Sequence, residues 1–411
     1  MQIGAAHLTY CSNIHPGSGW DTVFANLRAH VPRLKARLAP QAPFGLGLRL
    51  SSRESEELLA AGRLAQFQDF LQEHGLYVFT LNGFPYGAFH GQAVKAAVFA
   101  PDWRDPARRD YTLRLAAILA ALLPDGVEGG ISTVPLSYKP WLAGAGEEAW
   151  LAMVRHLVEI TTALVRERER SGRLIHLDLE PEPDGLLEHS REVLRFYQDW
   201  LLPHGGRLLA ERLGVTRDAA RDLLLQHIQV CLDACHLAVE YEDPLAALAR
   251  FALAGIRVGK AQLSAALRVP LPADRQRRAR IARQLAPFAE STYLHQVIEE
   301  RADGTLRHYP DLGAALPAIH APAARQWRIH FHVPVFLARY GLFHSTREAL
   351  QRLLACQQRT AFTRHLEIET YTWDVLPPAL KLDLSDSIER EYRWVLGVLQ
   401  APHGLAVPAA S

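Results

Sequence analysis

The sequence predicts an α/β fold, a (β/α)₈ barrel with insertions at its C-terminal mouth, from three observations. Strand-like and helix-like segments alternate along the whole chain, which is typical of parallel strands joined by helices. No other repeat and no low-complexity linker interrupts this alternation, so the 411 residues are expected to form one domain over 1–400, with a mobile tail at 401–411. Several strand-like segments also end on a carboxylate or an imidazole, as the strands of such a barrel do at its active-site mouth.

The individual elements follow from hydrophobic periodicity. Strands are expected at 3–10, 44–50, 77–82, 129–134, 174–180, 227–233, 256–263, 327–333 and 365–371. Helices are expected at about 20–37, 53–75, 105–123, 146–170, 186–213, 243–254, 274–288, 345–359 and 385–400. Nine strands are one more than a barrel needs, so either 256–263 or 327–333 is the seventh strand. Segment 288–316 is expected to form a hairpin around the ADGT turn at 302–305, as an insertion at the mouth.

Composition excludes several classes of function. With 45 basic and 44 acidic residues, the net charge of +1 gives no basic footprint, so we expect no nucleic-acid partner. The apolar stretches are too short for a bilayer span, and the chain opens directly on a strand, so neither membrane insertion nor a signal peptide is expected. The four cysteines form no CxxC pair, which favours free thiols in the cytoplasm. A homo-oligomer is compatible with the sequence.

Four strand-like segments end on groups that bind metals. They are LIHLDLE at Glu180, IQVCLD at Asp233, WRIHFH at His332 and HLEIE at Glu369. Three carboxylates and one imidazole suit Mn²⁺, Mg²⁺, Co²⁺ or Zn²⁺. Such a cation polarises a carbonyl group, and a carboxylate beside it can remove a proton from the adjacent carbon. The set therefore predicts a metal-dependent isomerase or epimerase for a small polyhydroxylated substrate.

Other polar and aromatic residues are expected near the same mouth. His7, Arg49 and Asn82 come from the first three strands, Asn13 and Trp20 from the loop after the first, and Tyr86 from the loop after the third. His330 shares one strand face with His332. Hydrogen-bonding groups with aromatic rings suit the hydroxyls of a sugar or cyclitol. The structural alternative is that the histidine and arginine are internally satisfied and that the aromatic rings seal the barrel end.

These residues resemble the xylose isomerase-like TIM barrels, a superfamily that includes sugar isomerases and epimerases. The resemblance rests on Glu180 in LDLEPEP, on Asp233 and His236 in LDACH, and on His332 and Glu369. It implies that Glu180 and Glu369 act as acid/base groups while binding the metal, and that His236 contacts substrate. Closer likeness is seen to the metabolite traffic protein EboE family of bacterial ebo gene clusters, in the segments HLTYCSNIHPGSGW, LNGFPYGAFHG, LDLEPEP, HFHVPVF and LEIETYTWDVLP. That likeness implies a cytoplasmic sugar-like or cyclitol intermediate.

The sequence departs from the superfamily pattern in one place. The strand after Asp-x-x-His carries Lys260 and Gln262 where simple epimerases carry the metal-binding histidine. Either Gln262 takes that position and weakens the site, or His332 fills it after an insertion. We favour His332, since a helix and the Glu369 strand follow it directly, as they would follow a seventh strand. Lys260 is then expected to contact a substrate anion or to act as an electrophile.

Two other functions stay open at this point. Metal-assisted hydrolysis, as in endonuclease IV-like barrels, would require more histidines in a multinuclear cluster and a basic groove for DNA. A binding or carrier protein would keep the barrel without the chemistry.

Overall fold

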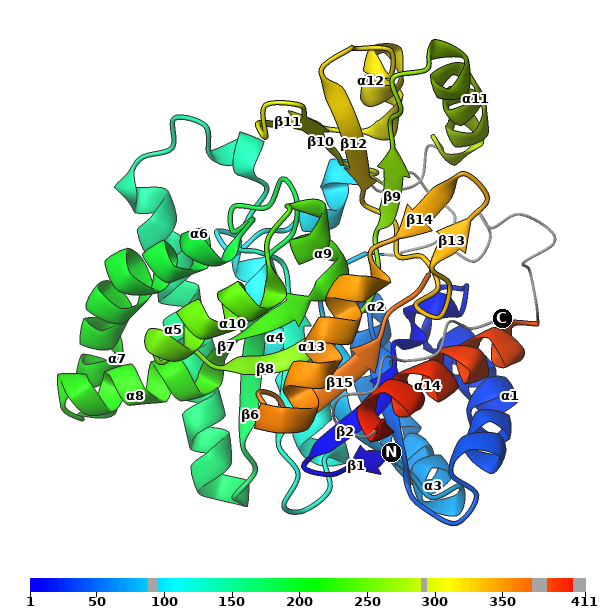
Figure 1. The fold of residues 1–411 in the computed structure, drawn as a ribbon. Coiled ribbons are helices and arrows are strands. Elements are labelled where there is room, and N and C mark those ends of the chain that lie inside the picture. The colour runs from blue at the N-terminus through cyan, green and yellow to red at the C-terminus, as the bar shows by residue number, and fades with distance from the viewer. Residues whose placement is uncertain (88–94, 290–293, 372–382, 402–411) are drawn as a thin grey trace.

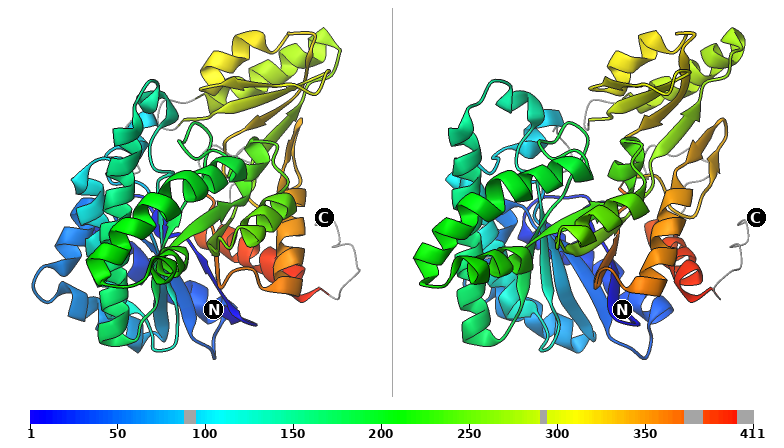
Figure 2. Two further views of the ribbon diagram at one scale, coloured as in Figure 1. Left: turned by 90° about the vertical axis from the view of Figure 1, so that its left-hand side faces the viewer. Right: turned by 60° about the vertical axis from the view of Figure 1, so that its left-hand side comes forward.

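The computed structural model describes residues 1–87, 95–289, 294–371 and 383–401. Within these residues, eight parallel strands form a barrel in the spatial order β2-β15-β8-β7-β6-β5-β4-β3 (Figures 1 and 2). They are β2 (Ala6–Tyr10), β3 (Phe44–Arg49), β4 (Leu76–Asn82), β5 (Gly129–Thr133), β6 (Ile175–Leu179), β7 (Ile228–Asp233), β8 (Val258–Leu263) and β15 (His365–Ile368). A short strand, β1 (Gln2–Ile3), pairs antiparallel with β2. The predicted (β/α)₈ barrel is confirmed.

The seam between β2 and β3 closes the barrel with few bonds. An isolated parallel bridge joins Cys11 to Gly47. The Thr9 hydroxyl donates to the carbonyl oxygen of Gly45 over 3.1 Å and accepts from the Gly47 amide over 2.7 Å. A side chain therefore supplies bonds that a backbone ladder supplies between the other barrel strands.

Replacing Gly47 by alanine is expected to destabilise the fold. A Cβ there would lie 1.9 Å from Oε1 of Glu367 and 2.7 Å from the backbone oxygen of Tyr10. Overpacking of this kind typically costs about 1–3 kcal/mol in the free energy of unfolding, which urea denaturation measures. Gly397→Ala is the control, because its Cβ meets nothing within 4 Å and lies in a helix. Equal stability of the two variants would contradict the packing argument.

Helices surround the barrel, as expected from the sequence, and several begin at clear capping signals. Ser51 and Glu54 form a capping box, and Asp105 and Asp243 each cap a helix that starts with proline. The helices are α1 (Trp20–Leu38), α2 (Ser52–Leu59), α3 (Arg63–Glu73), α4 (Pro106–Leu122), α5 (Glu147–Ser171), α6 (Ser190–Arg195), the π-helix η4 (Phe196–Gly205), α7 (Gly206–Leu213), α8 (Arg217–His227), α9 (Ala234–Val239), α10 (Pro244–Leu253), α13 (Arg347–Thr360) and α14 (Leu384–Gln400). Short 3₁₀ turns are η1 (Ser12–Ile14), η2 (Lys95–Phe99), η3 (Lys139–Leu142), η5 (Ala286–Phe288) and η6 (Leu316–Ala318).

A second, antiparallel sheet is inserted between β8 and α13 and rises on one side of the barrel (Figures 1 and 2). Its strand order is β11-β10-β12-β9-β14-β13. These strands are β9 (Leu267–Pro270), β10 (Val297–Arg301), β11 (Leu306–Tyr309), β12 (Ala324–Ile329), β13 (Arg339–Tyr340) and β14 (Phe343–Ser345), accompanied by α11 (Arg275–Leu285) and α12 (Leu312–Ala315).

The insertion resolves the question of the ninth strand. Segment 256–263 supplies β8, the seventh barrel strand, whereas segment 327–333 begins in β12 of the inserted sheet. Placing His332 on a seventh barrel strand was therefore wrong. The predicted hairpin is confirmed, since β10 and β11 pair antiparallel across residues 302–305. The predicted mobile tail lies outside the described residues from 402 onward, and the single-domain assignment stays a prediction.

The end of α8 gives the protein an acid sensitivity. His227 is buried, and its Nδ1 donates to the carbonyl oxygen of Ile175 over 2.7 Å. Burial lowers the pKa of His227 from 6.5 to about 4. Between about pH 6.5 and pH 4, His227 is therefore protonated in the unfolded chain but stays neutral in the folded protein. The free energy of unfolding should fall by about 2 kcal/mol from this group between pH 7 and pH 5.

Urea denaturation at these two pH values checks this prediction. The pH dependence should become shallower in His227→Gln, while His320→Gln, at an exposed position, should keep the wild-type dependence. An unchanged dependence in His227→Gln would remove His227 as its source.

Candidate metal centre and substrate pocket

A pocket opens where the carboxyl ends of the barrel strands meet the inserted sheet. It encloses about 660 Å³, part of which is open to solvent. Its lining combines carboxylates, imidazoles, amides and aromatic rings: Asn13, Asn82, Phe84, Pro85, Lys95, Val98, Phe99, Glu180, Glu182, His236, Leu294, Gln296, His330, His332, Glu369 and Tyr371. The mixture of groups suits a small polar ligand.

Glu180 and Glu369 enter this pocket from β6 and β15. Each residue follows the last residue of its strand, and its backbone amide continues the sheet by bonding to Thr133 and Leu263, respectively. Oε1 of Glu369 accepts hydrogen bonds from the side-chain amides of Asn13 (2.9 Å) and Asn82 (3.1 Å). These bonds fix the carboxylate, so Asn13 and Asn82 act here through Glu369.

Asp233 ends β7 and caps α9. Its Oδ1 accepts from the backbone amide of His236 (2.8 Å) and from the hydroxyl of Ser264 (2.9 Å). Oδ2 makes no hydrogen bond to any described residue and lies 3.9 Å from Nε2 of His332. Oδ1 therefore holds the aspartate in place, and Oδ2 lies on the side of His332, where it could bind a metal ion.

His332 reaches the barrel from the inserted sheet, in the segment that follows β12. Its Nδ1 donates to the backbone oxygen of Glu369 over 2.8 Å, and burial lowers its pKa to about 4. The ring is therefore neutral at pH 7, with the Nε2 lone pair on the side of Asp233. Gln262, the other candidate for this position, is buried on β8 beside Asp233 and Glu367, and its amide makes no hydrogen bond within the described residues. The structure brings His332, rather than Gln262, to the pocket wall.

The electrostatics of the pocket favour a bound cation. Burial, then the charges of Glu369 and Asp233, raises the pKa of Glu180 well above its usual value. Burial, then the carboxylates of Asp233 and Glu367, raises the pKa of Glu369 to about 8. Of the described residues that line the pocket, Lys95 alone carries a fixed positive charge, and it is paired with Asp311. Since Oε2 of Glu180 and Oδ2 of Asp233 are buried without hydrogen-bond partners in the described structure, the residues present fit a divalent metal ion.

Lys260 lies beneath the pocket and not in its wall. Its ammonium pairs with Glu367 inside the barrel, and both side chains are fully buried. Burial alone would lower the pKa of Lys260, but interactions led by Glu367 raise it above its ordinary value. The lysine is therefore a charged partner within the barrel, and a direct contact with substrate stays a prediction.

The remaining predicted substrate contacts fall into two groups. Asn13, Asn82, His236 and His330 line the pocket, whereas four others do not. His7 bonds to the hydroxyl of Tyr77 at the start of β2, Trp20 packs against Phe24 and Phe67, Arg49 pairs with Glu54 and bonds to the backbone of Pro85 and Gly87, and Tyr86 packs on Tyr111. None of these four side chains lines the pocket, so a contact with substrate stays a prediction for them.

Several pocket residues were missed from the sequence. Glu182 follows Glu180 by two positions in LDLEPEP, and this second acidic residue was an available signal. Gln296 and Leu294 come from the segment 288–316 that was expected at the mouth, but no residue type in it singled them out. Phe84, in the loop after the third predicted strand, and Tyr371, at the end of predicted strand 365–371, were not missed, because their positions already indicated the mouth.

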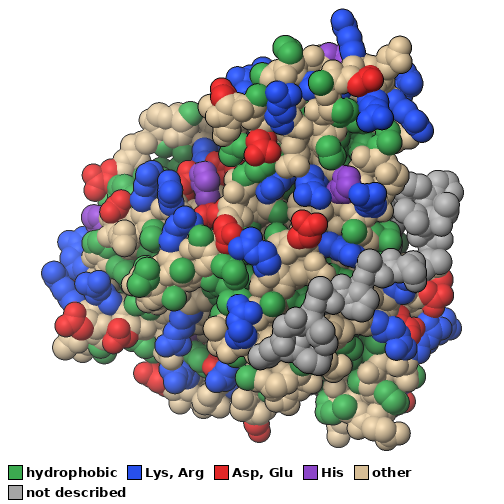
Figure 3. All heavy atoms as spheres, viewed as in Figure 1, with side chains coloured by type: hydrophobic (Ala, Val, Ile, Leu, Met, Phe, Trp, Pro, Cys, Tyr) green, Lys and Arg blue, Asp and Glu red, His purple; other side chains and the backbone are tan. Residues whose placement is uncertain are grey.

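Three further observations concern charge, helix hydrophobicity and the cysteines. On the face drawn in Figure 3, basic and acidic side chains are interspersed and no continuous basic stripe crosses it. In the part of the chain that the structure describes, no helix has both the length and the apolar character needed to cross a bilayer. All four cysteines are free thiols.

No family model matches the chain, and neither does any curated protein. Among solved structures, it is similar to a xylose isomerase-like TIM barrel protein from Mycobacterium smegmatis in complex with magnesium, with 11% identity, 97% and 98% of the two chains covered and a TM-score of 0.49. It is also similar to the IOLI protein with a zinc atom, with 12% identity, 96% and 98% of the two chains covered and a TM-score of 0.43. The probable 3-DHS dehydratase AsbF from Bacillus anthracis is similar too, with 10% identity, 95% and 98% of the two chains covered and a TM-score of 0.45. Because these TM-scores are below 0.5, the fold assignment depends on the strand order of this chain.

Proposed function

We propose that this protein is a divalent-metal-dependent isomerase or epimerase that acts on a sugar, a sugar phosphate or a cyclitol. The observation that carries this proposal is that Glu180, His332 and Glu369 line one pocket, with Oδ2 of Asp233 3.9 Å from Nε2 of His332. A metal held there would polarise a substrate carbonyl and stabilise the negative charge that forms when a neighbouring proton leaves. Mn²⁺, Mg²⁺, Co²⁺ and Zn²⁺ all suit three carboxylates and one imidazole.

The chain's own residues supply the proton transfer. Glu180 and Glu369 enter the pocket from β6 and β15, and their buried carboxyls have raised pKa values. A carboxyl group positioned beside a substrate carbon can take a proton from it and return the proton to a neighbouring carbon. Asn13 and Asn82 hold Glu369 through one oxygen, while Phe84 and Tyr371 give the pocket aromatic surface.

Exchange of substrate hydrogen with solvent tests the proposal. Purified protein with Mn²⁺ is incubated in D₂O with ketoses, ketose phosphates and inososes, and NMR follows the hydrogen on the carbon next to the carbonyl. Deuterium incorporation that stops when the metal is chelated is expected for at least one of these classes. Metal-loaded protein that exchanges hydrogen in none of them would contradict the proposal.

A second candidate, metal-assisted hydrolysis, is favoured by one observation. Three histidines, His236, His330 and His332, border the pocket, which is more than a simple isomerase set requires. In hydrolysis, oxygen from H₂¹⁸O would enter the product without exchange of carbon-bound hydrogen, so the two isotopes separate the two reactions. A non-catalytic binding protein would incorporate neither deuterium nor ¹⁸O into the small molecule.

We further propose that the chain belongs to the EboE family and works in the cytoplasm on a cyclitol or sugar-like intermediate. The five segments quoted above support this proposal. Neighbouring genes for a prenyltransferase-like membrane protein, a TatD-like hydrolase and a cyclase that resembles dehydroquinate synthase would strengthen it. An operon without any of them would count against it.

A further inference from the structure

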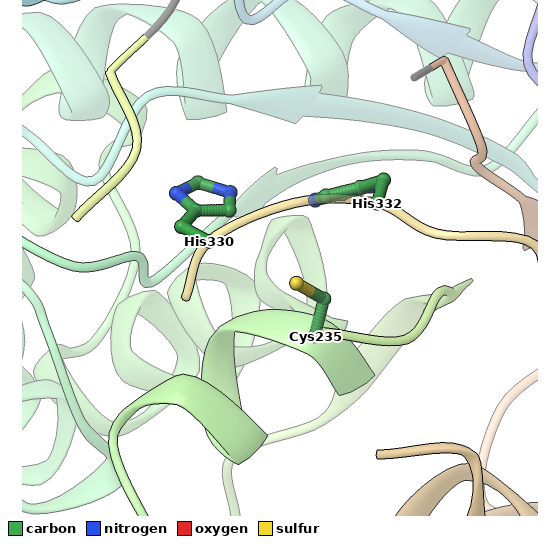
Figure 4. Close-up of side chains that lie close together, drawn as sticks. All are labelled: Cys235, His330 and His332. Atoms are coloured by element: carbon green, nitrogen blue, oxygen red, sulfur yellow. The ribbon is translucent and has the colours of Figure 1, made fainter. Parts of the chain in front are cut away.

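A second group of candidate ligands lies beside the first, on the side of the pocket formed by α9 and the inserted sheet. Glu182, His236 and His330 each offer one ligand atom, and these atoms all lie within 4.8 Å of one another. Figure 4 shows His330 and His332 on the same stretch after β12, above the start of α9, from which Cys235 points toward them. Within the group itself, Glu182 follows β6, His236 lies in α9 and His330 follows β12, so the three residues come from three different parts of the chain.

The tautomers of the two histidines are fixed by their other ring nitrogen. Nδ1 of His236 donates to the carbonyl oxygen of Pro181 over 2.9 Å, and Nδ1 of His330 donates to Oε1 of Gln296 over 2.8 Å. The amide of Gln296 is oriented in turn because its Nε2 donates to the carbonyl oxygen of Pro183. Both imidazoles thus present Nε2 as a lone pair, which is how metal-binding histidines are commonly held.

Two of the candidate ligand side chains in this group have a buried atom without a hydrogen-bond partner in the described structure. Nε2 of His330 and Oε1 of Glu182 are buried and make no hydrogen bond to any residue that the structure describes. The two side chains belong to residues that are 7% and 6% exposed. Nε2 of His236 lies 4.0 Å from Oε2 of Glu182 and 3.9 Å from Oδ1 of Asp233. Because that Asp233 oxygen already accepts two hydrogen bonds, Glu182 is the carboxylate left for His236.

We propose that Glu182, His236 and His330 form a second cation subsite that takes Zn²⁺. Two imidazoles and one glutamate, with a remaining position open to the pocket, are a ligand set that zinc occupies in catalytic sites. The first set, with three carboxylates, suits harder cations such as Mn²⁺ or Mg²⁺. The subsite rests on the proposed metal-dependent function of the same pocket and extends it from one cation to two.

Zinc titration of the full-length protein tests the subsite. Metal-free protein is titrated with Zn²⁺ in a calorimeter, and bound zinc is then counted by mass spectrometry after removal of excess metal. Wild type is expected to bind two equivalents, and Glu182→Gln and His330→Gln one each, because loss of a ligand should weaken the site by more than the roughly 100-fold upper limit for loss of an orienting partner. His344→Gln, on β14 of the same inserted sheet, is the matched control and should retain both equivalents. Circular dichroism of each metal-free variant verifies that it is folded.

The outcomes separate this inference from the proposed function. One equivalent in wild type that is lost in Glu369→Gln but unchanged in His330→Gln and Glu182→Gln would overturn the second subsite and leave the first intact. Binding that is lost in His330→Gln and Glu182→Gln but unchanged in Glu180→Gln and Glu369→Gln would support the subsite and overturn the first set. Wild type that binds no zinc would overturn the subsite.

Gln296 is a positioning residue in this account. Removing its bond to His330 by Gln296→Leu should leave two equivalents of zinc but weaken the second by about 10–100-fold, as loss of an orienting partner does elsewhere. Unchanged affinity in a folded Gln296→Leu protein would contradict the orienting role.

Discussion

Replacement of Glu369 by glutamine is expected to lower the rate of substrate hydrogen exchange by about 10²–10⁴-fold, the usual contribution of a positioned acid/base group. Glutamine keeps the size of the side chain and can still accept the amide hydrogen bonds of Asn13 and Asn82. It can neither take a proton nor carry the charge that a metal requires. Glu180→Gln should have an effect of the same order, because its carboxyl enters the same pocket from β6. Single-turnover exchange in D₂O measures both variants.

A matched control for these variants exists outside the pocket. Glu391 is also fully buried, and burial raises its pKa to about 8. Its Oε1 accepts from the Thr370 hydroxyl and the Val335 amide. Glu391→Gln makes the same carboxyl-to-amide change outside the pocket and should retain wild-type exchange once folded. Equal losses in Glu369→Gln and Glu391→Gln would assign the effect to the fold and not to proton transfer.

Replacement of Lys260 by methionine is expected to lower the free energy of unfolding by about 3–5 kcal/mol. The reason is that the buried carboxyl of Glu367 would lose the ammonium group that compensates it inside the barrel. Removing both charges, in Lys260→Met with Glu367→Leu, should recover much of this loss, since a buried pair of similar-sized apolar residues is often neutral or stabilising. Urea denaturation of the two single variants and the double variant measures the coupling between them.

The surface supplies the comparison for this pair. Arg53 and Glu57 form an ion pair one helical turn apart, with side chains 72% and 25% exposed. Arg53→Met should leave the unfolding transition close to that of wild type, because exposed pairs are weak. If Lys260→Met behaves in the same way as Arg53→Met, the buried pair does not stabilise the barrel as described.

The sequence was sufficient for the barrel and for most of its polar interior. The predicted strands 256–263 and 365–371 are neighbours in the barrel, and their residues Lys260 and Glu367 pair inside it. The strand-end rule correctly brought Glu180 and Glu369 to one pocket, because parallel strands all end at the same edge. Both inferences depend only on local pattern and on the closure of the sheet.

What the sequence could not show was the path of the chain outside the barrel. The inserted strand β12 has the same alternation as a barrel strand, so periodicity alone could not exclude it as the seventh. Its antiparallel partners β9 and β10 are set by long-range pairing. Arg49 and Trp20 have residue types that suit ligand contact, and only tertiary packing shows that Arg49 holds the loop at Pro85 while Trp20 lies in the core.

Crystals grown with Mn²⁺ and measured at an anomalous wavelength test whether this pocket binds a divalent metal ion. One anomalous peak is expected, bounded by Glu180, Asp233, His332 and Glu369, and it should disappear in Glu369→Gln crystals grown in the same way. A wild-type crystal with full Mn²⁺ in its mother liquor and no peak among these four side chains would contradict the proposed metal site.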